Sequence, residues 1–280
     1  MITINIVTAL NCEAKPLIDY YRLSKVNKKP FDFYTGQVNP VSKQSVEMNL
    51  IVGCIGQLNT AMACGWLAAQ SGLDRTIWLN VGIAGHKDNE VGRILRVCNV
   101  NDPITGFNHY PALTAKWNDD VSALMTSALP LSEYPEATLV DMEATAFFTA
   151  AGSCASSELV QSLKVVSDNQ EESLERLNAS LISQLIAAQI EKIVGFINEM
   201  VKLFPIQSTF HESSKLIEHL HCTVSQRQQF IELTEKLQSL KAFSKLFQDE
   251  IKQADSMKLV LQKLKQELTS IKPSLLDMTG

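Results

Sequence analysis

The stretch TLVDMEATAFFTAAG, Thr138 to Gly152, decides the fold class of this chain. It begins as a short apolar strand and then places Asp141, Met142 and Glu143 in a row, before a helix of small residues starts at Ala144. An acid at a helix start is stabilised by the exposed N–H groups and by the helix dipole. That explanation accounts well for one carboxylate and less well for two, so the second acid needs a reason from elsewhere in the chain.

Composition limits the classes of partner. The chain has 280 residues, 45% of them hydrophobic and 20% charged, with a formal net charge of −5. This balance is ordinary for a soluble globular protein, and it gives no electrostatic reason to expect nucleic acid or a membrane surface as partner. No apolar run is long enough to cross a bilayer, and the first residues lack the pattern of a signal peptide. We therefore expect a cytoplasmic protein.

Metal and disulfide chemistry are not indicated. The six cysteines show no C-x-x-C spacing, and neither they nor the five histidines form a ligand set. We expect reduced thiols and no bound metal.

The pattern of the chain changes near residue 205. Up to that point, strand-like runs at 2–7, 46–52, 76–81, 93–100, 138–141 and 163–166 alternate with helical stretches at 13–24, 57–71, 118–129, 143–151 and 171–203. Several strands are nearly all apolar, which indicates that both of their faces are covered. This alternation predicts an α/β domain with a mixed, largely parallel sheet over residues 1–204.

Residues 205–280 show only helical periodicity. Apolar residues recur at a spacing of three or four, and QADS at 253–256 could end one helix and cap the next. The periodic positions are Phe230, Leu233, Leu237, Leu240, Phe247, Ile251, Leu261, Leu264, Leu268 and Ile271. We expect a helical hairpin or coiled-coil-like extension, packed on the main domain or on a second copy of the chain, with a recognition module as the alternative.

Polar residues and glycine turns follow several of the predicted strands. In an open α/β sheet the carboxyl ends of the strands form the binding crevice, so these residues should meet there. They are Glu13, the pair Gly53 and Gly56, the pair Gly82 and Gly85, Asp141 with Glu143, and Ser167 with Asp168. Carboxylates on a rigid apolar frame are typical of a small-molecule enzyme site. The phosphate loop of NTPases and the full dinucleotide fingerprint are both missing from the sequence.

Five segments, in order, resemble the nucleoside phosphorylase/hydrolase superfamily, most closely its methylthioadenosine/adenosylhomocysteine nucleosidase branch. They are TALNCEAKPL (8–17), LIVGCIGQLNTAMA (50–63), WLNVGIAGH (78–86), VDMEATAF (140–147) and LKVVSDN (163–169). The resemblance covers roughly residues 1–200, and VDMEATA and VVSDN carry most of its weight. It implies a three-layer α/β/α phosphorylase-like fold, to which residues 205–280 add an extension.

The resemblance implies a purine nucleosidase, which hydrolyses the ribose–base bond of an adenosine-like or 5′-thio-nucleoside. Asp168 would protonate the leaving base with Ser167 orienting it, and Glu13 would activate water. Glu143 would hold the ribose hydroxyls and stabilise the developing positive charge, with Met142 against the sugar. Asp141 would support the helix start. The other substrate-binding positions are Ile55, Gly56, Gly82, Ile83 and Ala84. No cofactor is implied, and a homodimer is the default expectation.

Some positions depart from the family. Asn80 and Ile83 stand where phosphorylases place an arginine and a serine for phosphate, and with Glu13 nearby this favours water as nucleophile. Cys54 replaces a glycine, and the chain between Gly92 and Met142 is shorter than in close relatives. That part normally holds the base, and the aromatic residues that could replace it are Phe107, His109, Tyr110, Trp117 and Phe147. The alternative is therefore a protein of reduced catalysis that binds a nucleoside or acts through its helical tail.

Overall fold

The computed structural model describes residues 2–38, 46–71, 76–131, 134–172, 174–203, 216–223, 226–227, 229–230, 233–234, 237 and 243–270. The chain divides into two compact units, Met1–Leu203 and Phe204–Gly280.

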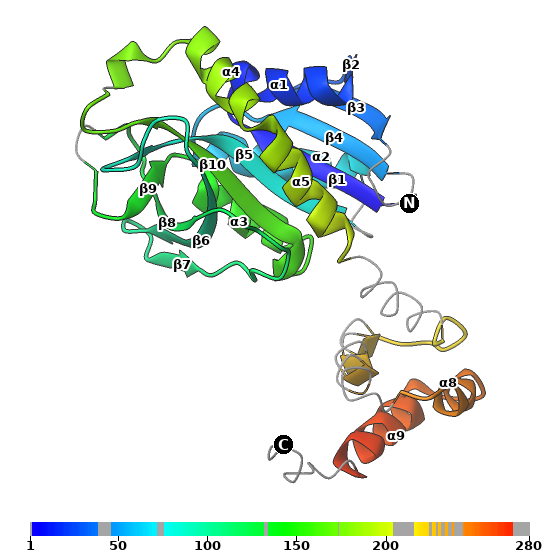
Figure 1. Ribbon diagram of the computed structural model, residues 1–280. Helices are drawn as coiled ribbons and strands as arrows, with labels where there is room; N and C mark the ends of the chain where they lie inside the picture. Colours follow the sequence, from blue (N-terminus) through cyan, green and yellow to red (C-terminus); the bar gives the residue numbers. More distant parts are fainter. Residues whose placement is uncertain are drawn as a thin grey trace. The chain divides into compact units, whose positions relative to one another are not determined.

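The first unit is a mixed α/β fold built on one large sheet (Figure 1). Its strands are β1 (Ile2–Thr8), β2 (Ser24–Val26), β3 (Asp32–Val38), β4 (Val46–Val52), β5 (Thr76–His86), β6 (Ile94–Asp102), β7 (Phe107–His109), β8 (Val121–Thr126), β9 (Thr138–Asp141) and β10 (Val160–Asp168). Their order is β10-β6-β8-β9-β5-β1-β4-β3-β2, with β7 on β6. Because β10 also pairs with β5, the strands β5, β10, β6, β8 and β9 form a closed ring of pairings.

The sheet is mixed, as predicted, and its parallel pairs include β6–β8 and β8–β9. Strands β4, β1, β5 and β10 run parallel to their neighbours in that series. The outer strands β3 and β2 are antiparallel, and so are the pairs β10–β6, β5–β9 and β6–β7. The parallel series still brings the carboxyl ends of β1, β4, β5 and β10 to one edge, which is where a ligand crevice forms.

Helices pack on the sheet in two groups. The helices are α1 (Asn11–Tyr21), α2 (Gln57–Ser71), α3 (Ala144–Gly152), α4 (Ala179–Ala188) and α5 (Ile190–Val201), with short 3₁₀ turns at Ser157–Leu159 and Leu174–Arg176. Helix α1 contacts α4 and α5, whereas α2 contacts α3. In Figure 1, α5 crosses in front of the sheet. The predicted bounds of α2 are confirmed.

Two predicted elements differ from the structure. Residues 118–129 are not a helix, because Val121–Thr126 form β8, which lies between β6 and β9. Its side chains alternate between buried and more exposed, the period of a strand, and pairing on both sides outweighs the helix preference of Ala, Leu and Met. The predicted helix at 171–203 is divided into α4 and α5, which meet at Gln189.

The core explains why the strands are apolar on both faces. Every residue of β1 and β10 is buried, as the sequence predicted for strands covered on both sides. The apolar cluster between the sheet and helices α2 and α3 includes Trp78, Leu67 and Phe147, each with no exposed surface. Burial of this kind contributes about 25 cal/mol for each Å² of apolar surface removed from water, so the sheet is a rigid support for the residues at its edge.

The second unit has its own apolar cluster. Helix α8 (Lys245–Lys252) starts after Ser244, whose side chain accepts a hydrogen bond from the Phe247 N–H at 3.2 Å, and α9 spans Met257–Ser270. The predicted break at 253–256 separates the two helices. Buried members of the cluster include Phe230, Leu233, Leu237, Ile251, Leu261 and Leu264, all positions of the predicted periodicity. Leu240 and Ile271 lie outside the described residues.

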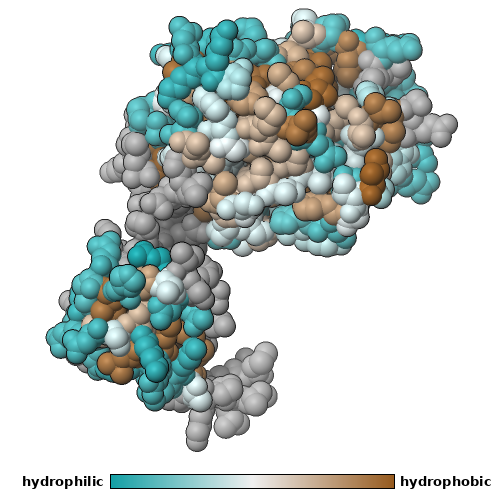
Figure 2. Space-filling model, turned by 180° about the vertical axis from the view of Figure 1, so that it is seen from behind, coloured by the Kyte–Doolittle hydropathy of each residue, from teal (hydrophilic) through white to brown (hydrophobic). Residues whose placement is uncertain are grey.

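The surface mixes polar and apolar patches, as Figure 2 shows for one face. Ile55, Leu58 and Met62 are among the exposed large apolar residues, and all three belong to α2 or to the turn before it. Within the described part of the chain, no single helix has the length and apolar character to cross a membrane; α4 and α5 meet that test only as a pair bent by 55°.

Candidate functional site

Three carboxylates line one cavity of about 260 Å³. Glu13 comes from α1 after β1, Glu143 lies between β9 and α3, and Asp168 is the last residue of β10. Far apart in sequence, they meet because the ends of β1, β9 and β10 lie around β5. The other lining residues are Ala9, Leu10, Ile55, Ile83, Ala84, Gly85, Leu129, Pro130, Leu131, Tyr134, Val140, Asp141, Met142, Ser167, Leu177 and Ile182.

Glu13 is tied to two strand ends by backbone donors. Its Oε2 accepts hydrogen bonds from the N–H groups of Ala9 and Leu10, both at 2.9 Å. Its Oε1 accepts from the Ile83 N–H of β5, also at 2.9 Å. Burial raises the pKa of Glu13, whereas the charge of Lys164 and these three donors act in the opposite direction. The carboxylate is therefore held in one position facing the cavity.

Gly82 and Gly56, both predicted to bind substrate, contact the acids of the site and are not among the residues that line the cavity. A Cβ at Gly82 would lie 2.9 Å from Glu13 Oε1, so a larger residue here would displace the carboxylate from its position. The Gly56 N–H donates to Glu143 Oε1 at 2.8 Å, and Gly56 has a φ of 96°, which favours glycine. Of the other predicted positions, Ile55, Ile83, Ala84, Met142 and Ser167 do line the cavity.

Glu143 has an unusual electrostatic environment. Besides the Gly56 bond, its Oε2 accepts from the Met142 N–H at 3.3 Å. Burial and then the negative charge of Asp141 raise the pKa of Glu143 to about 7, although Lys164 acts in the opposite direction. At neutral pH the residue therefore exchanges readily between its acid and carboxylate forms.

A buried lysine lies beside the acids, and it was not among the predicted site residues. Lys164 on β10 is 1% exposed, and its Nζ lies 2.8 Å from Asp141 Oδ2. Burial alone would lower the pKa of Lys164, but Asp141, Glu143 and Glu13 outweigh it, so the pKa is raised and the amine stays charged. The signal was available: a lysine inside the apolar strand LKVV can be buried only with a charged partner.

Asp141 does more than support the helix start. Its carboxylate accepts from the Ala144 N–H at 3.0 Å, which caps α3, and from Thr126 Oγ1 at 3.1 Å. Together with the ion pair to Lys164, these contacts link β8, β9, β10 and α3. Asp141 thus fixes the amine that compensates the acids of the cavity.

Asp168 is fully buried, and both of its oxygens accept a hydrogen bond. Ser167 Oγ donates to Oδ1, and the Tyr134 hydroxyl donates to Oδ2. The Tyr134 ring lies against Gly85, where a Cβ would overlap it. Burial, followed by the hydrogen bond to Asp168, raises the pKa of Tyr134, so its hydroxyl remains protonated.

Among the residues that the structure describes, Tyr134 is the one aromatic residue that lines the cavity, and none of the five predicted candidates does. Phe107 and His109 stack on each other, and His109 also contacts Phe148. Trp117 packs on Phe196, and Phe147 belongs to the core. Tyr110 is 67% exposed. Tyr134 was not predicted because it lies in the connection before β9, and it reaches the site from outside the ends of the parallel strands.

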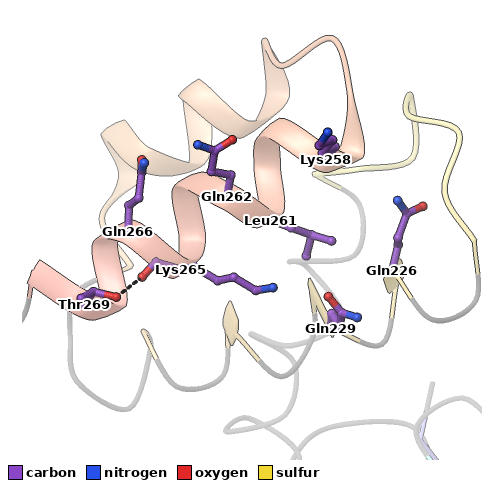
Figure 3. Close-up of a pocket in the computed structure, with 8 residues that line it drawn as sticks. All are labelled: Gln226, Gln229, Lys258, Leu261, Gln262, Lys265, Gln266 and Thr269. Carbon is purple, nitrogen blue, oxygen red and sulfur yellow. Dashed lines mark hydrogen bonds between the residues drawn. The ribbon is translucent and has the colours of Figure 1, made fainter.

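A second, open groove lies in the second unit (Figure 3). Four glutamines, two lysines, a leucine and a threonine line it: Gln226, Gln229, Gln262, Gln266, Lys258, Lys265, Leu261 and Thr269. Gln262 and Gln266 point away from Gln226 and Gln229 in Figure 3. These side chains include no general acid or nucleophile of the kind present at the first cavity, so the catalytic candidates lie in the first unit. Among the described residues, no group of three or more His, Cys, Asp or Glu could hold a metal ion.

Solved structures share the fold over about seven-tenths of this chain. The methylthioadenosine/adenosylhomocysteine nucleosidase of Streptococcus pneumoniae, with a transition-state inhibitor, matches with a TM-score of 0.58 and 18% identity, over 71% of this chain and 100% of that chain. The Chlamydia trachomatis nucleosidase matches at 0.56 with 20% identity, over 70% and 98% of the two chains. The Arabidopsis thaliana methylthioadenosine nucleosidase matches at 0.53 with 17% identity, over 72% and 96%.

The fold is that of the methylthioadenosine/adenosylhomocysteine nucleosidases. The resemblance read from the five sequence segments is therefore confirmed for the fold. No family model and no curated protein matches the amino-acid sequence itself. At this level of identity the likeness extends to architecture, and the chemistry has to be argued from the cavity.

Proposed function

We propose that this protein is a purine nucleoside N-glycosidase that hydrolyses the ribose–base bond of an adenosine-like or 5′-thio-nucleoside. The observation that carries the proposal is the convergence of Glu13, Glu143 and Asp168 on one cavity, each in a different electrostatic environment. Hydrolysis of this bond needs an acid for the base, a negative charge for the ribose and a base for water.

Asp168 is the proposed general acid. It transfers a proton to a purine ring nitrogen as the C–N bond breaks, so the base leaves as a neutral molecule rather than as an anion. Ser167 orients the carboxyl through its bond to Oδ1, so the base would use Oδ2, which accepts from the Tyr134 hydroxyl in this structure.

Glu143 and Glu13 are proposed for the sugar and the water. Glu143, ionised, accepts hydrogen bonds from ribose hydroxyls and stabilises the positive charge that develops on the ring. Glu13 takes a proton from the attacking water, and its three backbone donors keep it aimed into the cavity. Met142, Ile55, Ile83 and Ala84 provide the apolar walls.

Water rather than phosphate is the proposed nucleophile. Lys164 is the cation of this cluster, and its charge is already compensated by Asp141, with Glu143 and Glu13 nearby. A phosphate dianion would therefore meet an excess of negative charge in a region of low dielectric constant.

The test is adenine release measured by chromatography, with methylthioadenosine, adenosylhomocysteine and adenosine as substrates in phosphate-free buffer. We expect turnover by the wild type and loss of at least 10²-fold in Asp168→Asn, whereas Asp19→Asn, at an exposed position, retains activity. Strict dependence of turnover on added phosphate would overturn hydrolysis.

Binding of nucleoside without turnover in both wild type and Asp168→Asn would favour a nucleoside-binding protein of reduced catalysis. The hydroxyl of Tyr134 on Asp168 is the observation that supports this second candidate.

The wider organisation belongs to the same proposal. We propose a cytoplasmic homodimer whose nucleosidase domain spans residues 1–204 and whose helical extension spans 205–280, with no nucleic acid or membrane as partner and no cofactor. Sedimentation of the full chain and of a 1–204 fragment would test the dimer and the independence of the domain.

A further inference from the structure

The phenol of Tyr134 occupies the side of the cavity that the proposed mechanism reserves for the base. Its hydroxyl is bonded to Asp168 Oδ2, while Ser167 holds Oδ1. A purine nitrogen needs one of these two oxygens. Ser167 is the sequence neighbour of Asp168 on β10, so the oxygen held by Tyr134 is the one that a ligand can reach by displacing a side chain.

The size of the cavity leads to the same conclusion. Its volume is about 260 Å³ with Tyr134 in the wall. Small-molecule sites usually offer roughly 300–1,000 Å³. Moving the phenol away from Asp168 and Gly85 would enlarge this end of the cavity and expose Asp168 Oδ2.

We propose that Tyr134 is a specificity-determining residue: its phenol lies where the base would bind, and a purine must displace its hydroxyl from Asp168 to bind. This inference rests on the proposed function, because it assumes that Asp168 meets the base. The residue selects ligands by competition. A base that offers Asp168 a hydrogen-bonding nitrogen regains the bond that Tyr134 gives up, whereas an apolar group of the same size does not.

The displacement also frees the oxygen that meets the base. In this structure Ser167 and Tyr134 each donate a hydrogen bond to one oxygen of Asp168. Once Tyr134 leaves Oδ2, this oxygen can face the base nitrogen, to which the proposed general acid passes its proton as the C–N bond breaks.

The test compares adenine binding by wild type, Tyr134→Phe and Tyr110→Phe with isothermal titration calorimetry. Tyr134→Phe keeps the ring but removes the competing bond and leaves Asp168 Oδ2 without its donor, so we expect adenine to bind roughly ten-fold more tightly. Tyr110 is exposed and outside the cavity, so Tyr110→Phe should bind adenine like the wild type. Equal or weaker binding by Tyr134→Phe would overturn the proposal.

A second measurement does not depend on a variant. In a crystal of the wild type soaked with adenine, the Tyr134 hydroxyl should lie beyond hydrogen-bond distance of Asp168; a Tyr134 still bonded to Asp168 beside the adenine would overturn the proposal. The outcome is separable from that of the proposed function. Tighter adenine binding by Tyr134→Phe without release of adenine from any nucleoside would leave the displacement standing and remove the nucleosidase activity.

Discussion

Replacing Lys164 by methionine should show how much this buried amine contributes to the free energy of unfolding. Methionine has a similar length and fits an apolar strand, so the change removes the charge with little change in packing. Lys164 is buried against Asp141 at 2.8 Å, and both side chains are at most 2% exposed. Removing one partner of a buried ion pair leaves the other charge uncompensated, which typically costs about 3–5 kcal/mol.

The loss should depend on pH in a defined direction. Glu143 has an ordinary pKa of 4.5, and in the folded protein burial raises it to about 7. A carboxyl group of this kind binds an extra proton in the folded state, so its contribution to stability falls as the pH rises from about 4.5 to about 7. Without Lys164 the pKa values of Glu143 and Glu13 rise further, because its charge lowers both of them. The difference between wild type and Lys164→Met should therefore grow between about pH 5.5 and pH 8.5.

Urea unfolding at these two pH values measures the effect. Lys15→Met is the matched control, because Lys15 is 67% exposed in a helical pair with Asp19, and its loss should change the free energy of unfolding by less than about 0.5 kcal/mol. Adding Asp141→Asn to Lys164→Met should restore part of the lost stability, since it removes the uncompensated charge. If Lys164→Met is as stable as Lys15→Met at high pH, or its loss does not grow with pH, the account of this charge cluster is wrong.

Further predictions concern the neighbours of this cluster. If ribose binding needs ionised Glu143, kcat/KM for nucleoside should rise with pH through about 7. Glu143→Gln should abolish this rise of kcat/KM with pH. A flat pH profile of kcat/KM around neutral pH in the wild type would contradict the assignment. Gly82→Ala should lower adenine release at least ten-fold, because its Cβ would lie 2.9 Å from Glu13 Oε1, whereas Gly195→Ala, in open space on α5, should be neutral to stabilising. Cys54 has a φ of 65°, so Cys54→Gly should raise the free energy of unfolding by about 0.5–1 kcal/mol in urea, and a lower midpoint would argue against backbone strain there.

The sequence indicated the acids because their positions follow from topology. Glu13, Glu143 and Asp168 each follow a run with a clear strand pattern, and the carboxyl ends of parallel strands meet at one edge of a sheet. The structure places all three on one cavity, although the sequence could not give the order of the strands.

The residues that escaped prediction depend on contacts between distant segments. Tyr134 reaches Asp168 from a connection with no periodic pattern, and Lys164 is explained only by acids from distant segments of the chain. The strand at Val121–Thr126 was not predicted for a related reason, because its pairing with β6 and β9 cannot be inferred from its own residues. Gly56 and Gly82 were recognised as special positions, but whether a glycine faces a ligand or a neighbouring carboxylate depends on side-chain packing.

The pairing of β10 with both β5 and β6 has a consequence for how the domain folds. This strand is the last of the sheet to be synthesised, and it closes the ring between β5 and β6 while carrying both Lys164 and Asp168. Without this strand the ring of pairings would be open, and Glu13, Asp141 and Glu143 would lack the buried amine that offsets their charge. We therefore expect the closing of the ring and the balancing of these charges to occur in the same step of folding.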